Sequence, residues 1–142
     1  MARILMIDDD SDIVEAARIP LEAAGHEFHS ASSGAEGLRL VQATVPDLVI
    51  LDVMMETYTS GFHVSQRLRD PSPASPYAAC RDVPILMLTA IHTTTVLRFE
   101  PDQDYLPVDE FLEKSAGPEA LVATVERLLA KRQKDVSGRG RD

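Results

Sequence analysis

Carboxylates stand directly after two apolar runs of this sequence. Three of them, Asp8 to Asp10, follow the run 3–7, and Asp52 follows the run 48–51. Both runs are short and aliphatic, which is typical of strands buried on both faces of a parallel sheet. Ligands of open α/β sheets bind beyond the carboxyl ends of the strands, so we expect these carboxylates to gather at one edge. Because gathered carboxylates repel one another unless a cation offsets their charge, the pattern predicts a divalent metal with oxygen ligands, most naturally Mg²⁺.

The rest of the chain supplies the elements that would hold this edge together. Apolar segments predict strands at 3–7, 26–31, 48–51, 83–88 and 109–112, and amphipathic segments predict helices at 11–25, 34–43, 62–69 and 118–131. Strands that alternate with helices indicate right-handed crossovers and an α/β fold with a five-stranded parallel sheet. The flavodoxin-like order 2-1-3-4-5 puts the first and third strands side by side. Asp8, Asp9, Asp52 and Thr89 would then meet at one edge.

Individual residues predict where the first helix begins, how it continues and where a loop lies. We interpret Ser11 as the N-cap of the first helix and Asp10 and Asp12 as further capping residues rather than site residues. Pro20 predicts a kink or an early break in that helix, because it removes a backbone donor. The segment 71–81 is rich in Pro, Ser and Ala, which indicates a surface excursion.

The composition is that of an acidic globular chain with one domain. The 142 residues carry a formal net charge of -9, and 131–142 carry an excess of basic side chains, so the body is more acidic still. Such a body repels nucleic-acid phosphates, and we expect no direct nucleic-acid binding. The single cysteine, Cys80, fits a reducing compartment, and no apolar stretch is long enough to span a bilayer. We expect a cytoplasmic protein without a membrane partner, with a domain at 1–131 and a basic disordered tail or linker remnant at 132–142.

Four motifs at the predicted strand ends resemble one family as a set. They are Arg3-Ile-Leu-Met-Ile-Asp-Asp-Asp, Asp47-Leu-Val-Ile-Leu-Asp-Val-Met-Met, Pro84-Ile-Leu-Met-Leu-Thr-Ala and Glu110-Phe-Leu-Glu-Lys. In this order they resemble the receiver domains of two-component response regulators, also called CheY-like domains, and the likeness covers roughly residues 2–131. The resemblance implies a regulatory signal transduction domain and not an enzyme, with activity limited to self-phosphorylation and autodephosphorylation.

The resemblance further implies a Mg²⁺-dependent phosphoryl transfer to Asp52, which would become an aspartyl phosphate. The donor would be a sensor histidine kinase, a phosphotransfer protein or a small phosphodonor. Asp9 and Asp52 would bind Mg²⁺ directly, together with the backbone carbonyl of Met54, and Asp8 would act through bound water. Three donors would hold the phosphoryl oxygens: the hydroxyl of Thr89, the backbone N–H of Ala90 and the ammonium of Lys114.

A conformational switch is implied by the same resemblance. When Thr89 is drawn toward the phosphoryl group, Phe111 would rotate into the space behind it. The face formed by the family's fourth helix, the strand 109–112 and the terminal helix 118–131 would then change and meet an unidentified downstream protein. The last helices could also form a homodimer.

Two features of the chain depart from the family pattern. Lys114 is followed by Ser115 where receivers usually have Pro, and the segment 91–108 lacks the usual approach to the fifth strand. These departures leave open the alternative that the chain is a pseudo-receiver, which is a folded interaction module that accepts no phosphoryl group. A weaker alternative is an aspartate-nucleophile phosphohydrolase of the haloacid dehalogenase type, based on Asp8 and Asp10 at the first strand end.

Overall fold

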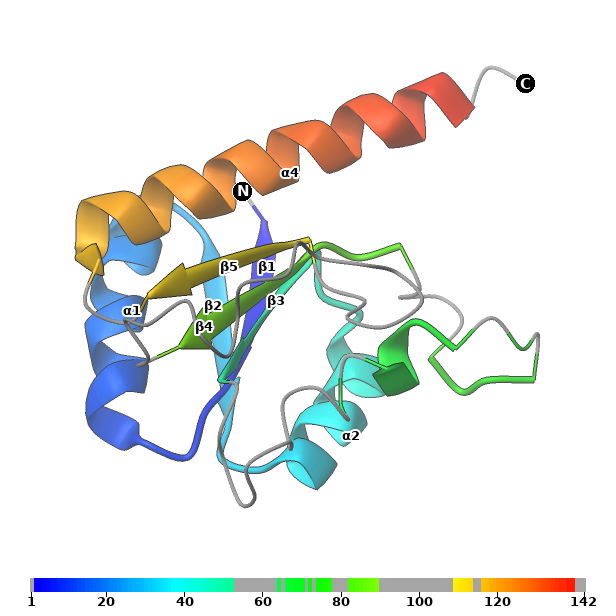
Figure 1. Ribbon diagram of the computed structural model, residues 1–142, viewed down its shortest axis with the longest axis horizontal. Helices are drawn as coiled ribbons and strands as arrows, with labels where there is room; N and C mark the ends of the chain where they lie inside the picture. The colour runs from blue at the N-terminus through cyan, green and yellow to red at the C-terminus, as the bar shows by residue number, and fades with distance from the viewer. Residues whose placement is uncertain are drawn as a thin grey trace, which may run out of the picture.

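The fold is built on one five-stranded parallel sheet (Figure 1). The computed structural model describes residues 2–52, 64, 66–70, 72, 74–77, 82–89, 109–113 and 116–139. The strands are β1 Arg3–Ile7, β2 Glu27–Ala31, β3 Leu48–Asp52, β4 Ile85–Thr89 and β5 Glu110–Glu113. Their order is β2-β1-β3-β4-β5, and every pair is parallel, which confirms the predicted flavodoxin-like fold.

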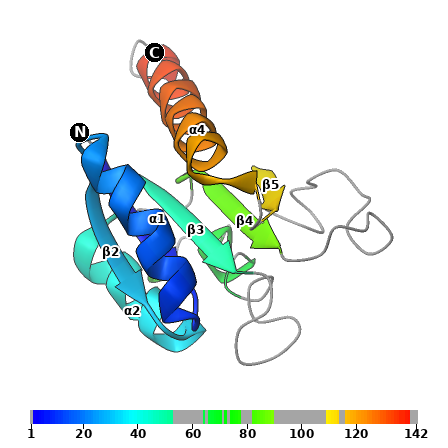
Figure 2. The same ribbon diagram turned by 90° about the vertical axis from the view of Figure 1, so that its left-hand side faces the viewer.

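Helices cover both faces of this sheet (Figure 2). The helices with described bounds are α1 Ser11–Ala23, α2 Gly34–Thr44 and α4 Pro118–Arg139, and residues 64 and 66–68 are helical as well. The apolar sides of α1 and α4 pack on one face, and those of α2 and of the helical residues Val64 and Leu68 pack on the other. Among the described residues, none of the helices combines the length and the apolar composition needed to cross a bilayer.

The central strands are apolar throughout because both of their faces are covered. Ile4 and Met6 of β1 belong to the core cluster under α1 and α4, whereas Leu5 and Ile7 belong to the cluster under α2. All four side chains are fully buried, as are the side chains of residues 48–51 in β3. A strand with two buried faces reads as a continuous apolar run, which is why both strands were recognisable in the sequence.

The start of α1 corrects one prediction, and its course past Pro20 contradicts the early break that was expected there as an alternative to a kink. The N-cap is Asp10, whose Oδ1 accepts from the backbone N–H groups of Asp12 and Ile13, so Ser11 is the first helical residue and not the cap. The capping role expected of Asp10 is confirmed, whereas Asp12 lies in the first turn. The helix also continues past Pro20, which lies near the carboxyl end of α1. The proline removes only one backbone donor, and its carbonyl oxygen still accepts from the Ala24 N–H.

Two further segments differ from the sequence-based expectation. The helix α4 continues beyond Lys131 to Arg139, where a disordered tail was expected. Arg132, Gln133 and Lys134 are good helix formers but carry no apolar stripe, so the apolar pattern used for the prediction stopped before them. The segment 71–81 is not only a surface excursion, because Tyr77 is buried in the core and the Pro76 carbonyl oxygen accepts from Gln42 Nε2 at 3.4 Å. The burial of Tyr77 could not be predicted, because a single tyrosine in a Pro-rich stretch shows no helical or strand periodicity.

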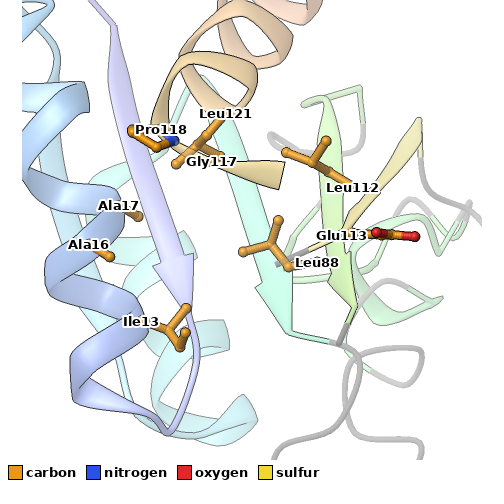
Figure 3. Close-up of a pocket in the computed structure, with 9 residues that line it drawn as sticks. All are labelled: Ile13, Ala16, Ala17, Leu88, Leu112, Glu113, Gly117, Pro118 and Leu121. Carbon is orange, nitrogen blue, oxygen red and sulfur yellow. The ribbon is translucent and has the colours of Figure 1, made fainter. Parts of the chain in front are cut away.

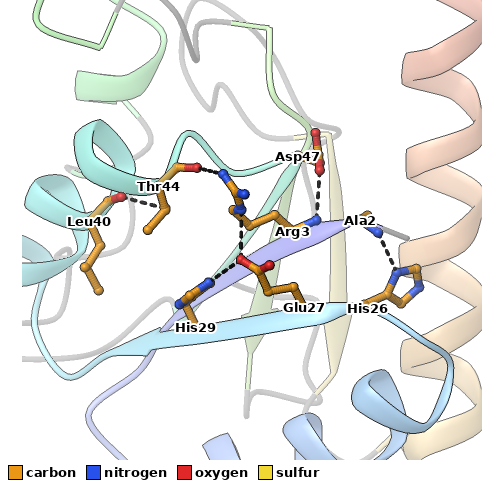
Figure 4. Close-up of polar contacts among 8 residues, drawn as sticks. All are labelled: Ala2, Arg3, His26, Glu27, His29, Leu40, Thr44 and Asp47. Carbon is orange, nitrogen blue, oxygen red and sulfur yellow. Dashed lines mark hydrogen bonds and ion pairs between the residues drawn. The ribbon is translucent and has the colours of Figure 1, made fainter.

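Polar side chains tie the amino-terminal edge of the sheet together (Figure 4). Arg3 Nε donates to Glu27 Oε2 at 2.9 Å, and its guanidinium also donates to the Thr44 carbonyl oxygen at the end of α2. The same Glu27 oxygen lies 2.6 Å from His29 Nε2. Asp47 Oδ2 accepts from the backbone N–H of Arg3 at 2.8 Å. These contacts hold the starts of β1 and β2 against the end of α2. They lie at the amino-terminal ends of the strands, whereas Asp8 lies at the carboxyl end of β1.

Replacing Glu27 with Gln should lower Tm near neutral pH but not in acid. The hydrogen bond with His29, followed by the interaction with Arg3, holds the pKa of the Glu27 carboxyl below its ordinary value of 4.5. A carboxyl whose pKa is lowered by folding contributes stability above its unfolded pKa and loses it as the pH falls through the folded pKa. Thermal unfolding of wild type and Glu27→Gln at both pH values checks this. A difference in Tm that persists or grows in acid would contradict it.

Replacing Val45 with Gly should stabilise the fold by about 1 kcal/mol. Val45 caps the carboxyl end of α2 with φ 46 and ψ 70, a left-handed conformation that strains a β-branched residue, and 49% of it is exposed. Val45→Ala is the matched control, because it shortens the side chain but keeps the Cβ that causes the strain. Urea unfolding of the three proteins measures the effect. Equal stability of Val45→Gly and Val45→Ala would show that the conformation costs nothing here.

Candidate functional site

The carboxyl ends of β1 and β3 bring three carboxylates together. In the parallel pairing of these strands Ile7 lies opposite Leu51, so the residues that follow, Asp8 and Asp52, lie side by side at the same edge. The backbone N–H of Asp8 donates to the Ala31 carbonyl oxygen at 3.0 Å, which fixes the exit from β1 against β2. Asp9 then lies in the turn that leads into α1. The convergence expected for Asp8, Asp9 and Asp52 is therefore present.

These three residues form what we call the carboxylate cluster. One carboxylate oxygen of each of Asp8, Asp9 and Asp52 lies within 4.8 Å of the others. Asp8 is 2% exposed and Asp52 3% exposed, whereas Asp9 is exposed to solvent. The backbone N–H of Asp10 donates to Asp8 Oδ1 at 2.9 Å and helps to orient that carboxylate. The cluster thus has two buried members and one member that opens it to solvent.

The chemistry of the cluster suits a small hard cation. Three carboxylates so close together repel one another, and water screens the two buried members poorly. A divalent cation with oxygen ligands would turn that repulsion into attraction, and carboxylate oxygens are the donors that Mg²⁺ and Ca²⁺ prefer. Asp10 does not belong to the cluster, because its carboxylate is engaged in capping α1. The set of donors therefore fits the predicted metal.

The other predicted site residues lie only partly within the described chain. Thr89 is the last residue of β4, and the pairing of Asp52 with Leu88 brings its backbone to the same edge as the cluster. Met54, Ala90 and Lys114 lie outside the described residues, and so does the side chain of Thr89. Their predicted roles stay predictions.

Phe111, the predicted switch residue, lies in β5 opposite Met87 of β4. It is partly buried and packs against the core cluster to which α2, Val64 and Leu68 contribute. A side chain in this position can lose further exposed apolar area by moving inward, because part of it still faces solvent. Its predicted rotation stays a prediction.

An apolar cavity lies next to this edge of the sheet, between α1 and the start of α4 (Figure 3). Its volume is about 290 Å³, and its aliphatic lining includes Ile13, Ala17, Leu88, Leu112 and Leu121. Glu113 is the one charged residue of the lining. Apart from Glu113 the lining offers neither a metal ligand nor a general acid or base, and none of the three cluster residues belongs to it. The sequence did not indicate it, because segments far apart in the chain form it.

Comparisons with known proteins agree on one family. A sequence profile described as the response regulator receiver domain matches residues 4–126. Among solved structures, the chain is similar to the chemotaxis response regulator CheY4 of Vibrio cholerae, with 30% identity, a TM-score of 0.74 and coverage of 90% of this chain and 98% of that one. It is also similar to the N-terminal domain of a response regulator receiver protein from Methanoculleus marisnigri JR1, with 33% identity, a TM-score of 0.66 and coverage of 92% and 98%.

Curated relatives are longer than this chain. The DNA-binding dual master transcriptional regulator RpaA of Synechocystis sp. is 36% identical over 131 residues, which are 91% of this chain and 49% of RpaA. The response regulator SaeR of Staphylococcus epidermidis is 29% identical over 137 residues, which are 94% of this chain and 53% of SaeR. The chain thus spans about half the length of the curated relatives it matches.

Replacing Asp9 with Asn should stabilise the protein without divalent cations and weaken its response to Mg²⁺. The neutral side chain removes one of three repelling charges, which is worth about 1 kcal/mol at such distances. We expect a higher Tm than wild type in a chelator and a smaller rise of Tm when Mg²⁺ is added. Asp12→Asn is the matched control, an exposed residue of the same turn outside the cluster. Equal behaviour of both variants would contradict the electrostatic account.

Proposed function

Because the chain belongs to the response regulator receiver domain family, we propose that it accepts a phosphoryl group on Asp52 and thereby switches a protein-interaction face. The observation that carries this proposal is the convergence of Asp8, Asp9 and Asp52 at the ends of β1 and β3. The donor would be a sensor histidine kinase or a phosphotransfer protein in the cytoplasm. The receiver unit would comprise 1–131, with 132–142 as a tail or linker.

The proposed reaction is an in-line displacement at phosphorus. A carboxylate oxygen of Asp52 attacks the phosphorus of a phosphohistidine or of a small acyl phosphate, and the new O–P bond makes a mixed anhydride. The bond between phosphorus and the donor's nitrogen or oxygen breaks, and that atom keeps the electron pair. The attacking carboxylate and the phosphoryl oxygens are all negative, so the site has to offset their charge with fixed positive groups.

The carboxylate cluster would hold Mg²⁺ for this purpose. In our proposal Asp9 and Asp52 are direct ligands, Asp8 acts through bound water, and the backbone carbonyl of Met54 completes the protein's share. The hydrogen bond from the Asp10 N–H to Asp8 supports this assignment, because it orients a ligand that is almost completely buried. When bound, the ion supplies positive charge beside the oxygens of the transferred group.

Three donors from β4 and β5 would complete the phosphoryl site. The Thr89 hydroxyl and the Ala90 backbone N–H would each hold one phosphoryl oxygen, and the Lys114 ammonium would hold another as a point charge. The topology supports this grouping, since β4 lies beside β3, β5 lies beside β4, and Thr89 pairs with Glu113. Lys114 directly follows Glu113 in the chain.

The proposed output is a change on the face that includes β5 and α4. Phosphorylation would draw Thr89 toward the site, and Phe111 would move into the space behind it. Phe111 packs against an apolar core cluster, so inward rotation would bury more apolar area without leaving a polar group unsatisfied. A downstream protein, or a second copy of the chain, would recognise the changed face.

Two other functions remain as alternatives with different chemistry. A pseudo-receiver would keep the fold and take no phosphoryl group. An aspartate-nucleophile phosphohydrolase would need Asp8 and Asp10 together as a catalytic pair. The N-cap geometry disfavours this pair, because the carboxylate of Asp10 accepts from two backbone N–H groups of α1 and would have to abandon them.

Incubation with Mg²⁺ and acetyl phosphate should add one phosphoryl group to the wild type and none to Asp52→Asn. The amide keeps the shape of the side chain but cannot form the mixed anhydride. Intact-protein mass spectrometry measures the gain, and Asp12→Asn is the control that should gain it like the wild type. No gain in the wild type would support the pseudo-receiver. Continuous phosphate release that is lost in Asp8→Asn but kept in Asp52→Asn would support the phosphohydrolase.

A further inference from the structure

A side chain as well as the backbone holds β5 against β4. Asp109, the residue before β5, donates its backbone N–H to the Ile85 carbonyl oxygen at 2.9 Å. Its Oδ2 also accepts from the backbone N–H of Ile85 at 2.7 Å. One residue thus satisfies both backbone groups of the first residue of β4. This double contact fixes the register in which Thr89 pairs with Glu113 at the other end of the two strands.

Arg69 completes this arrangement from the connection between β3 and β4. Its Nη2 donates to Asp109 Oδ2 at 2.6 Å, and its Nη1 donates to the Val83 carbonyl oxygen at 2.6 Å. The Arg69 side chain is 17% exposed and that of Asp109 is 32% exposed, so Arg69 is largely withdrawn from water whereas Asp109 still faces it in part. Burial lowers the pKa of the Arg69 guanidinium, and the charges of Asp109 and Asp82 act in the opposite direction. We call Arg69 and Asp109 the register clamp.

The register of β5 matters because this strand is short and has a neighbour on one side. It has four residues and pairs with β4 alone among the described strands. A shift of one residue in the pairing would turn every β5 side chain to the other face of the sheet. Lys114 follows the last residue of β5 directly, so in the proposed function the register of β5 would set the point from which Lys114 reaches toward the site.

We propose that Asp109 and Arg69 are positioning residues for phosphoryl transfer to Asp52, because the register clamp sets where Lys114 reaches the phosphoryl group. This inference rests on the proposed function. The clamp acts at the amino-terminal edge of the sheet, at the opposite end of β5 from Lys114. The carboxylate cluster lies at the ends of β1 and β3, and the pairing of these two strands involves neither Asp109 nor Arg69.

The test compares phosphorylation rates of clamp variants with acetyl phosphate at saturating Mg²⁺. Asp109→Ala removes the side-chain contacts with the Ile85 N–H and with Arg69 but keeps the backbone hydrogen bond to the Ile85 carbonyl oxygen. It should phosphorylate about tenfold more slowly, because small misplacements of a charged group are costly in rate. Asp109→Asn keeps an oxygen that can accept from Ile85 and should stay within about threefold of the wild type. All rates are measured well below the unfolding temperature of every variant.

The neighbouring residue in β5 provides a matched control. Glu110 forms an ion pair with Arg127, with its two oxygens 2.6 and 2.7 Å from the guanidinium nitrogens, and does not contact the clamp. Glu110→Ala removes this more exposed pair and should phosphorylate within about twofold of the wild type. Two readouts separate positioning from general destabilisation. The Mg²⁺ affinity of Asp109→Ala should be unchanged, and the amides of β5 should exchange hydrogen faster while those of β1 and β3 stay protected.

Each outcome decides between the proposals. A wild type that takes up no phosphoryl group overturns the proposed function, and the positioning role falls with it. If the wild type reacts and a folded Asp109→Ala variant reacts at the same rate, the positioning role alone is overturned. A parallel loss of rate, Mg²⁺ affinity and protection in β1 and β3 also overturns it, because the clamp would then act on the whole fold. A slow Asp109→Ala with intact Mg²⁺ affinity and rescue by Asp109→Asn supports it.

Discussion

Repulsion among three carboxylates is the constraint on which the rest of this structure depends. Two adjacent parallel strands end in Asp8 and Asp52, which are both almost completely buried, and Asp9 completes the group. A fold that only needed stability would not place such charges together, because each loses hydration and gains a like-charged neighbour. A bound cation would offset the repulsion among the three carboxylates and so account for their placement. The pairing of β1 with β3, the bond from the Asp8 N–H to β2 and the bond from the Asp10 N–H to Asp8 hold the charges in place.

The sheet and its order could be predicted from the sequence because the physical causes were local. Runs of aliphatic residues such as 3–7 and 48–51 follow from burial on both faces, and alternation with amphipathic helices restricts the topology. Once the order was known, the meeting of Asp8 and Asp52 followed from the pairing of Ile7 with Leu51. The carboxylate cluster was therefore predictable from the sequence. The roles of Lys114 and Thr89 came from the family resemblance and lie in the proposal.

The rest of the structure escaped prediction because its causes are long-range or stereochemical. The ion pair of Arg69 with Asp109 joins residues far apart in the chain, and neither residue has a periodic signal. The same is true of Tyr77, whose burial depends on a contact between a Pro-rich segment and the core. At α1, the choice of Asp10 over Ser11 as the cap depends on one backbone conformation. Such details decide how β5 and the site edge are held, although they do not decide the fold.

Paramagnetic broadening by Mn²⁺, which substitutes for Mg²⁺ at oxygen sites, tests the central claim most directly. In a nitrogen-15 correlation spectrum with substoichiometric Mn²⁺, the account predicts that the amides of Asp8, Asp9 and Asp52 broaden first and that excess Mg²⁺ restores them. Acidic residues at the opposite edge, such as Glu27 and Asp47, should stay sharp. Broadening that begins at those residues, or that leaves the carboxylate cluster unaffected, would contradict the account.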